Sequence, residues 1–332
     1  MVTISIVINN YNYARFLREA IDSALHQTYQ PVEVIVVDDG STDSSAEVIK
    51  SYGDRVTSLF QPNNGQASAF NTGFRVAHGD VVLFLDSDDV LHPNAVERIV
   101  LQWNQHYSKI HWRLSVIDSC SASTGKLYPK LPLDSGDLRA QLLKKGSYTS
   151  APTSGNAFSR SYLEQVMPIP EQSWRGYADC YLLFLAPLHG SIGVITEPLS
   201  SYRVHGKNMT NLIGAGGTVN LQTIEKELKR DAKQRQLLLD ACKKAGERLE
   251  PGAVLDDCFH LKRRLASLKL QPRQHPFPDD TIMSLLAKIL DSAWQETSFS
   301  TTKKLLFSCW AIAMATLPTK LSMAVATAGF QK

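Results

Sequence analysis

Three carboxylates fall within four residues at the end of one apolar run. Residues 81–85 are Val, Val, Leu, Phe and Leu, and Asp86, Asp88 and Asp89 follow them. Such a run is typical of a strand that is buried on both faces. Crowded carboxylates at a buried strand end destabilise the protein unless a cation compensates their charge. Mg2+ or Mn2+ suits such oxygen ligands, and Mg2+ shares them with substrate phosphates. The alternative is a solvated turn in which Asp88 or Asp89 caps a helix.

A second apolar run ends in the same way. Residues 32–37 lead directly into Asp38 and Asp39. Ligands bind at the carboxyl ends of the strands in an open α/β sheet, and two acidic strand ends favour a shared ligand site over helix capping alone. Neither a G-x-G-x-x-G motif after the first strand nor a G-x-x-x-x-G-K-[ST] motif is present, so a dinucleotide-binding or P-loop protein would lack its phosphate cradle.

The elements that must position these carboxylates alternate along the chain. Apolar, β-branched runs predict strands, and apolar residues spaced i, i+3, i+4 predict helices. The predicted strands are 3–9, 32–37, 56–60, 81–85, 110–120, 155–159, 193–196 and 201–204. The predicted helices of this part are 14–28, 43–52, 66–77, 137–145 and 179–188. Strands that alternate with helices predict an α/β domain with a mainly parallel sheet.

From about residue 221 the sequence predicts helices only, over 221–245, 253–269 and 280–294. Residues 305–317 are apolar almost all round, but thirteen residues are too few to span a bilayer. They would lie in a membrane interface or pack under the first domain. We therefore predict a first domain over 1–206, with halves at 1–109 and 110–206, and a helical region over 207–332 that is a candidate for membrane association.

Composition and charge narrow the class of protein. The hydrophobic content of 43% and charged content of 20% suit a folded globular protein. Five cysteines, none at C-x-x-C spacing, favour a reducing compartment. The first 205 residues are mildly acidic and the remainder is basic, which suits either an anionic surface near the tail or a solvated helical face. The basic residues lack interleaved aromatics, so we expect no nucleic-acid partner. No leader is evident before residue 3, and we expect a cytoplasmic protein, peripheral on the inner face of the cell membrane.

Taken together, these segments resemble the family 2 inverting glycosyltransferases. The close matches are 5–12, 23–28, 33–43, 64–65, 71–73 and 85–89, and looser ones follow at 155–158, 179–181 and 202–206. The resemblance implies a GT-A fold, with a mainly parallel central sheet flanked by helices and a C-terminal helical extension. It also implies a metal-dependent enzyme that transfers a sugar from a nucleotide-diphosphate donor to a saccharide or lipid-linked acceptor, with inversion.

The resemblance assigns donor-side roles to named residues. The implied nucleotide-sugar contacts are Asn9, Tyr11, Asp39, Gln66, Asn71 and Asp86. Asp39 would accept a hydrogen bond from the base of a UDP-sugar, the donor we expect. Asp88 would bind Mg2+ or Mn2+, and Asp89 would assist it or orient the sugar. His205 resembles a segment near the donor phosphates, where it would be a metal ligand or a phosphate contact; a structural role is the alternative.

On the acceptor side, Asp179 stands where the family has its catalytic base. The family residue before the base is usually Glu, whereas Ala178 precedes it here. An N-cap role for Asp179 is the alternative, and both roles are compatible. Asn156 and Trp174 are the expected acceptor contacts; Asn156 could instead be a turn residue and Trp174 a core residue.

Two other functions remain open from the sequence. A sugar nucleotidyltransferase would be expected to carry a Gly-rich, Arg- or Lys-bearing loop after the first strand, and residues 9–12 contain neither Gly nor a cation. A catalytically inactive binding or scaffold protein of the same fold is the second alternative. The presence of Asp39, Asp88 and Asp179 argues against it.

Overall fold

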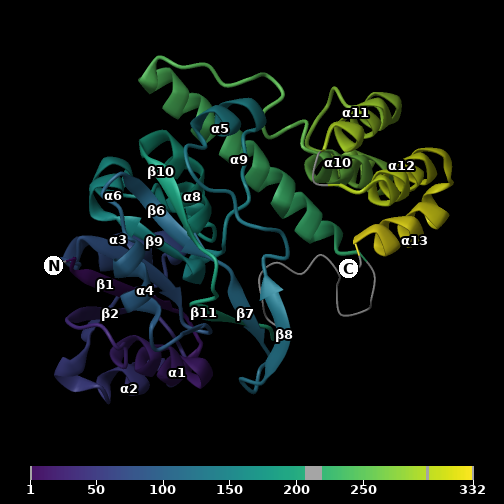
Figure 1. The fold of residues 1–332 in the computed structure, drawn as a ribbon. Coiled ribbons are helices and arrows are strands. Elements are labelled where there is room, and N and C mark those ends of the chain that lie inside the picture. Colours follow the sequence, from purple (N-terminus) through teal and green to yellow (C-terminus); the bar gives the residue numbers. More distant parts are fainter. Residues whose placement is uncertain (1, 206–218, 297–298, 331–332) are drawn as a thin grey trace. The chain divides into compact units, whose positions relative to one another are not determined.

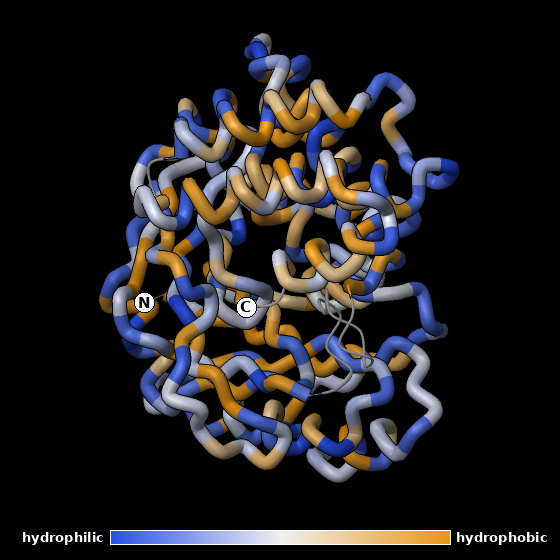
Figure 2. Tube along the Cα trace, turned by 90° about the vertical axis from the view of Figure 1, so that its right-hand side faces the viewer, coloured by the Kyte–Doolittle hydropathy of each residue, from blue (hydrophilic) through white to orange (hydrophobic). Residues whose placement is uncertain are grey.

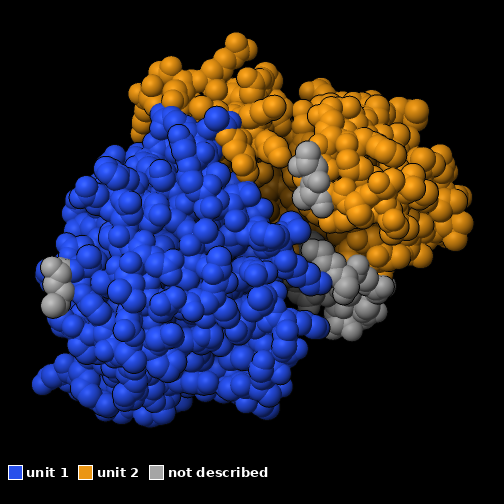
Figure 3. All heavy atoms as spheres, viewed as in Figure 1, with its two compact units in different colours: residues 1–140, 148–206 blue, residues 141–147, 207–332 orange. Residues whose placement is uncertain are grey.

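The computed structural model describes residues 2–205, 219–296 and 299–330. Contacts divide the chain into two compact units, which are coloured separately in Figure 3. Unit 1 contains residues 1–140 and 148–206, and unit 2 contains residues 141–147 and 207–332. Gly206, the last residue of the segment resembling the family at 202–206, lies outside the described residues.

Unit 1 is built on a seven-stranded sheet (Figure 1). In spatial order its strands are β10 (Ser191–Ile195), β6 (Tyr107–Trp112), β9 (Asn156–Ser159), β4 (Val81–Asp86), β1 (Ile4–Asn10), β2 (Val32–Asp38) and β3 (Thr57–Phe60). The pairs β4–β1, β1–β2, β2–β3 and β10–β6 are parallel, whereas β9 runs antiparallel to both β4 and β6. The predicted α/β fold with a mainly parallel central sheet is confirmed.

Helices alternate with these strands. They are α1 (Ala14–Leu25), α2 (Ser45–Lys50), α3 (Gln66–Val76), α4 (Ala95–Gln102), α6 (Arg160–Val166), α7 (Glu171–Trp174) and α8 (Ala178–His189). A further helix, α5 (Arg139–Lys145), begins in unit 1 and continues in unit 2. Helices on the sheet faces explain why the central strands are largely apolar rather than alternating.

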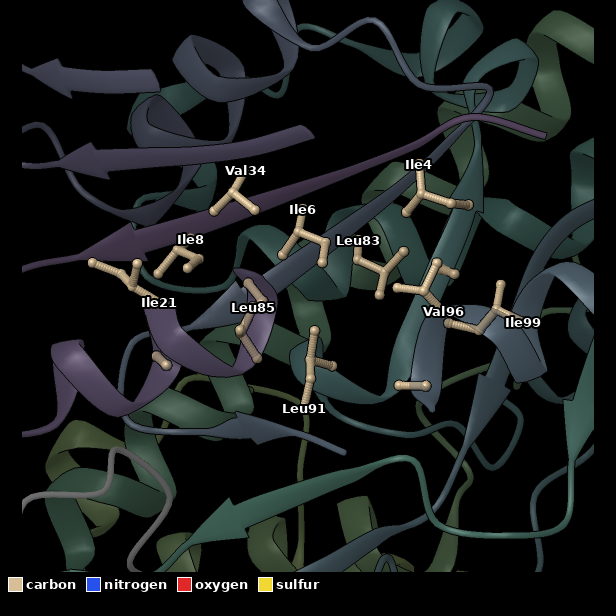
Figure 4. Close-up of a cluster of buried hydrophobic side chains, with 14 of the residues drawn as sticks. Ile4, Ile6, Ile8, Ile21, Val34, Leu83, Leu85, Leu91, Val96 and Ile99 are labelled. Carbon is tan, nitrogen blue, oxygen red and sulfur yellow. The ribbon is translucent and has the colours of Figure 1, made fainter. Parts of the chain in front are cut away.

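The core defines two faces of the sheet. Side chains alternate along a strand, so Ile6 and Ile8 of β1 share one face, where they cluster with side chains from β4, α1 and α4 (Figure 4). Val7 lies on the other face, where α3 packs: a Cβ added at Gly73 of α3 would collide with Val7. Asn9, two residues further along β1, therefore lies on the α3 side.

A second, four-stranded sheet completes unit 1. Its order is β5 (Val90–Leu91), β11 (Ser200–Arg203), β7 (Leu114–Ile117) and β8 (Ser123–Tyr128). The prediction of one strand over 110–120 is wrong, because β6 and β7 are separate strands of different sheets. Both parts mix apolar with polar residues, so composition does not reveal the break at Arg113. Strand β5 follows the acidic run directly and pairs with β11, which brings residues 200–203 beside that run.

Unit 2 is mostly helical. Its long helices are α9 (Leu221–Ala245), α10 (Cys258–Leu270), α11 (Ile282–Gln295), α12 (Thr301–Thr316) and α13 (Thr319–Phe330). Figure 2 shows hydrophobic and hydrophilic residues interspersed along the chain. Leu228, Leu261 and Ile289 are buried in one hydrophobic core. The apolar stretch 305–317 lies mainly in α12, and α13 is an additional helix beyond Pro318. Among the described residues, none of the helices combines the length and hydrophobicity needed to cross a bilayer.

Candidate active site

Strand register places polar side chains side by side at the carboxyl edge of the main sheet. Asn9 of β1 lies opposite Asp86 of β4, and Asn10 lies opposite Asp38 of β2. Successive strand residues face opposite sides of a sheet. Asn9 and Asp86 therefore lie on the α3 side, where Asn9 Nδ2 donates to Asp86 Oδ1 at 3.1 Å. Asn10 and Asp38 lie on the α1 side.

The carboxylate of Asp38 is used within the protein. Its Oδ1 accepts hydrogen bonds from Asn10 Nδ2 at 2.7 Å and from Ser41 Oγ at 2.6 Å, and its Oδ2 accepts from the Ser41 amide at 3.1 Å. These bonds hold the turn that follows β2. Tyr11, next after Asn10, is 46% exposed at the same edge, and its side chain is open to a ligand.

Asp39 lies beneath the backbone of the loop at residues 64–65. It is buried, and its carboxylate accepts from Gln61 Nε2 at 2.7 Å, the Asn64 amide at 3.0 Å and the Gly65 amide at 2.7 Å. A carboxylate can accept about four hydrogen bonds, so these three do not exhaust its capacity, and the contact of Asp39 with a nucleobase stays a prediction. Gly65 has φ +93°, and Arg175 packs so closely that a Cβ at Gly65 would collide with it. The loop over Asp39 therefore requires glycine.

The carboxylates after β4 disfavour one another's ionisation. Burial, followed by the charges of Asp88 and Asp179, raises the pKa of Asp86 to about 7. Burial, followed by the charges of Asp88 and Asp86, holds the pKa of Asp89 well above its usual range. Burial, followed by the charges of Asp88, Asp86 and Asp89, raises the pKa of the nearby Tyr13 hydroxyl to about 12. The site therefore holds more negative charge than its own hydrogen bonds compensate, which favours a cation.

Gln66 joins this acidic cluster to the start of α8. Its Nε2 donates to Asp86 Oδ1 at 3.3 Å, and its Oε1 accepts from the Ala178 amide at 3.2 Å. Asp179 is the second residue of α8, and its Oδ1 accepts from the Cys180 amide at 2.8 Å. The charge of Asp179 reaches Asp86, whose pKa it helps to raise. The structure thus brings the predicted base and the predicted donor carboxylates into one site.

Asp88 and His205 form the pair best suited to hold a metal ion. His205 Nε2 lies 2.9 Å from Asp88 Oδ2, and both side chains are largely buried. In the part of the chain that the structure describes, no group of three or more His, Cys, Asp or Glu side chains is arranged for a metal ion. Mg2+ commonly takes one or two carboxylates and completes its shell with phosphate oxygens and water. The donor set therefore fits an ion that is shared with a diphosphate.

Asp89 has a different contact. Its side chain is 2% exposed, and its Oδ1 accepts from the Arg203 amide at 2.9 Å, which ties the acidic loop to β11. A contact with the metal or the sugar stays a prediction for this residue.

Three other predicted contacts are engaged elsewhere in unit 1. Asn71 is buried and exchanges two hydrogen bonds with the Ile169 backbone, at 2.9 and 2.8 Å. Asn156 is buried, and its Oδ1 accepts from Lys109 Nζ at 2.6 Å. Trp174 is buried against aromatic rings of α8. The structure does not join these three to the carboxylates, and their ligand contacts stay predictions.

A buried lysine on β6 is a feature that sequence reasoning missed. Lys109 Nζ contacts Asn156 Oδ1 at 2.6 Å, Ser150 Oγ at 2.7 Å and His111 Nδ1 at 3.0 Å. Burial lowers the pKa of Lys109 well below its usual range, and the charge of Asp179 opposes that shift. A single charged residue within an otherwise buried strand was the available sequence signal.

A mainly parallel sheet with an acidic carboxyl edge and a small second sheet gives a fold of the GT-A-like class, and solved structures agree. The crystal structure of S. aureus TarS matches with a TM-score of 0.53 and 16% identity, over 98% of this chain and 55% of TarS. The structure of TarS 1–349 in complex with UDP-GlcNAc matches with a TM-score of 0.53 and 15% identity, over 98% of this chain and 91% of that chain. At these identities the comparison establishes the fold.

Sequence comparison agrees with the predicted resemblance. The model described as Glycosyl transferase family 2 matches residues 5–166, and this segment is similar to that family. An uncharacterized glycosyltransferase of Nostoc sp. is 41% identical over 212 residues, 62% of this chain and 66% of that protein. The glycosyltransferase GlyG of Streptococcus pneumoniae is 42% identical over 103 residues, 30% of this chain and 34% of that protein. The matches thus span less than two thirds of these relatives' length.

Proposed function

We propose that this chain transfers a sugar from a nucleotide-diphosphate donor to an acceptor hydroxyl with inversion at the anomeric carbon. The observation that carries the proposal is the joining of Asp86 to the start of α8 through Gln66, with Asp179 as the next residue. A single displacement needs one set of groups for the departing diphosphate and a separate base for the incoming hydroxyl. The β4 edge and the start of α8 supply those two sets.

On the donor side, Asp39 accepts a hydrogen bond from the base, and Asp88 with His205 holds Mg2+ or Mn2+. When bound, the ion neutralises the negative charge that develops on the leaving diphosphate. The UDP-GlcNAc named for TarS supports a UDP-sugar as the first donor to test. Asn9 and Gln66 both donate to Asp86 Oδ1, and this fixes the orientation of the carboxylate that faces the donor.

On the acceptor side, Asp179 takes the proton of the acceptor hydroxyl while the hydroxyl oxygen attacks the anomeric carbon. The new C–O bond forms on the face opposite the leaving group. The bond between the anomeric carbon and the phosphate oxygen breaks, its electron pair stays on that oxygen, and the nucleoside diphosphate departs. Asp179 ends protonated and returns its proton to solvent.

Unit 2 supports a saccharide or lipid-linked acceptor near a membrane surface. Leu305, Leu306 and Ile312 of α12 are 51%, 67% and 46% exposed, at a spacing that places them on one side of the helix. The sequence from 297 to 332 contains lysines and no acidic residue. Exposed apolar side chains with basic neighbours suit the interface of an anionic bilayer.

Calorimetric titration tests the donor half of the proposal. UDP, GDP and dTDP are titrated with and without Mn2+ into wild type, Asp88→Ala and, as a control, Asp54→Ala, which changes an exposed residue. We expect UDP to bind more tightly with Mn2+ than without it. The ratio of these two affinities should fall at least tenfold in Asp88→Ala, because Asp88 is one of two side chains placed for the ion. Asp54→Ala should behave as wild type. A folded wild type that binds no nucleotide would contradict the transferase and favour the scaffold alternative.

A further inference from the structure

We propose that Arg203 is a positioning residue that sets the geometry of the Asp88–His205 pair and thereby the contribution of the metal ion to nucleotide binding. The inference rests on the proposed function, because it assigns Arg203 a role at the same site. Arg203 lies two residues before His205, at the end of β11, and its side chain is fully buried.

The guanidinium of Arg203 links three segments that are distant in sequence. Its Nε donates to the Asp88 carbonyl oxygen at 2.7 Å, and its NH2 group donates to Glu19 Oε2 of α1 at 2.6 Å. Its NH1 group donates to Ser121 Oγ at 2.7 Å, in the turn between β7 and β8. The Arg203 amide also donates to Asp89 Oδ1 at 2.9 Å. Arg203 therefore forms hydrogen bonds with two consecutive residues after β4, Asp88 and Asp89.

Aromatic contacts carry the same constraint to His205. The Arg203 guanidinium lies 4.7 Å from the centroid of the Phe16 ring, and that ring lies 5.3 Å from the His205 ring. The Tyr13 ring also packs against His205, with the two ring centroids 5.5 Å apart. Phe16 and Glu19 are one turn apart on α1 and so face Arg203 together. Arg203 and His205 are thus braced by one face of α1, while Asp88 is held through its backbone.

This arrangement separates positioning from charge. Arg203 meets Asp88 through the backbone carbonyl, while Asp88 Oδ2 faces His205. The positive charge of Arg203 is paired with Glu19. Lysine would keep the charge but has three donors on a single nitrogen, and it cannot reproduce the planar fork that reaches Asp88, Glu19 and Ser121 at once. Substitution by lysine should therefore move the two metal-facing side chains without neutralising the site.

Arg160 offers a matched control in the same unit. It also anchors loops through backbone carbonyls, with Nε donating to Gly79 O at 2.8 Å and NH2 donating to Ala77 O at 2.7 Å. These contacts lie before β4, at the amino end of the strand whose carboxyl end carries Asp86. An Arg160→Lys variant should lose comparable structural bonds without touching the Asp88–His205 pair.

The experiment measures UDP affinity with and without Mn2+ for wild type, Arg203→Lys, Glu19→Gln and Arg160→Lys, with the melting temperature of each. We expect Arg203→Lys to keep metal-free UDP affinity within about threefold and to lose at least tenfold of the Mn2+-dependent gain. Glu19→Gln, a milder change, should lose part of that gain and covers the case in which Arg203→Lys folds poorly. Arg160→Lys should keep the whole gain. The electron paramagnetic resonance spectrum of protein-bound Mn2+ should change in Arg203→Lys, change less in Glu19→Gln, and stay as in wild type in Arg160→Lys.

Three results would overturn the inference. A full Mn2+-dependent gain in both Arg203→Lys and Glu19→Gln would show that Arg203 does not position the pair. A second contrary result is that Arg203→Lys loses UDP affinity equally with and without Mn2+, and that Arg160→Lys, at a similar melting temperature, shows the same loss. Arg203 would then have a general structural role. A wild type that binds UDP with no Mn2+ effect would remove the metal role in the proposed function, and this result is distinct from the other two.

Discussion

Replacing Asp179 by Asn is expected to slow sugar transfer by roughly 10²–10⁴-fold, the usual contribution of a general base. Asn retains an oxygen that can accept from the Cys180 amide, so the start of α8 should keep its local structure. Asn cannot take the proton of the acceptor hydroxyl, so the loss should fall on the rate of transfer. Release of UDP from UDP-GlcNAc, with water and a panel of glycans and polyprenyl phosphates as acceptors, provides the measurement.

Nucleotide affinity separates loss of the base from loss of the site. UDP should bind Asp179→Asn within about threefold of wild type, because the proposed donor contacts lie on other elements than α8. Asp257→Asn serves as the control, since Asp257 caps α10 in unit 2 by accepting from two backbone amides; its transfer rate should match wild type. An Asp179→Asn enzyme that transfers sugar at the wild-type rate would remove Asp179 from the reaction.

The largest effect on stability is expected for Asp231→Asn in unit 2. Asp231 is buried on α9, and its Oδ2 accepts from His260 Nδ1 and from Arg263, both at 2.7 Å, while its Oδ1 accepts from Arg230 at 2.8 Å. Removing one partner of a buried charge network costs about 3–5 kcal/mol of unfolding free energy. At about 2–4 °C per kcal/mol for domains of 150–250 residues, the melting temperature should fall by roughly 6–20 °C.

The same substitution has a defined pH dependence. Burial alone would raise the pKa of Asp231, but the His260 hydrogen bond and the charges of Arg263 and Arg230 lower it far below its usual range. A carboxylate whose pKa is lower in the folded state stabilises the protein above its unfolded pKa and loses that contribution as the pH falls below it. The difference between wild type and Asp231→Asn should therefore be full at pH 7 and shrink below about pH 4.

Thermal melting at several pH values checks this expectation. Asp240→Asn, on the exposed side of α9, is the matched control and should melt within about 2 °C of wild type. Equal melting temperatures for the Asp231 and Asp240 variants at pH 7 would mean that the Asp231 network adds no net stability.

The central strands could be predicted because each is buried on both faces and is therefore largely apolar. The acidic residues at the ends of β2 and β4 were visible for the same reason: charge follows directly on a buried run. The break between β6 and β7 was not visible, because both strands mix apolar with polar residues and only their partners differ. Local pattern identifies a strand, whereas the sheet to which it belongs depends on distant pairing.

The links within the candidate site were equally hidden. Gln66 contacts Ala178, and Arg203 contacts both Asp88 and Glu19, across more than a hundred residues of sequence. The family resemblance placed Gln66 and Asp179 on opposite sides of the reaction without indicating a bond between their segments. The sequence also does not reveal the internal contacts of three predicted ligand residues. In the structure, other residues of unit 1 contact Asn71, Asn156 and Trp174.

The segment 141–147 has an evolutionary consequence. It is flanked in sequence by unit 1 on both sides, yet its backbone carbonyls serve unit 2: Leu143 O accepts from the Glu250 amide at 3.0 Å, and Lys145 O accepts from the Val254 amide at 2.9 Å. A recombination event with one breakpoint near residue 206 would give unit 2 a new partner and leave these seven residues behind. Exchange of unit 2 between relatives therefore needs three coordinated crossovers, two around 141–147 and one near residue 206, and the two units should be inherited together.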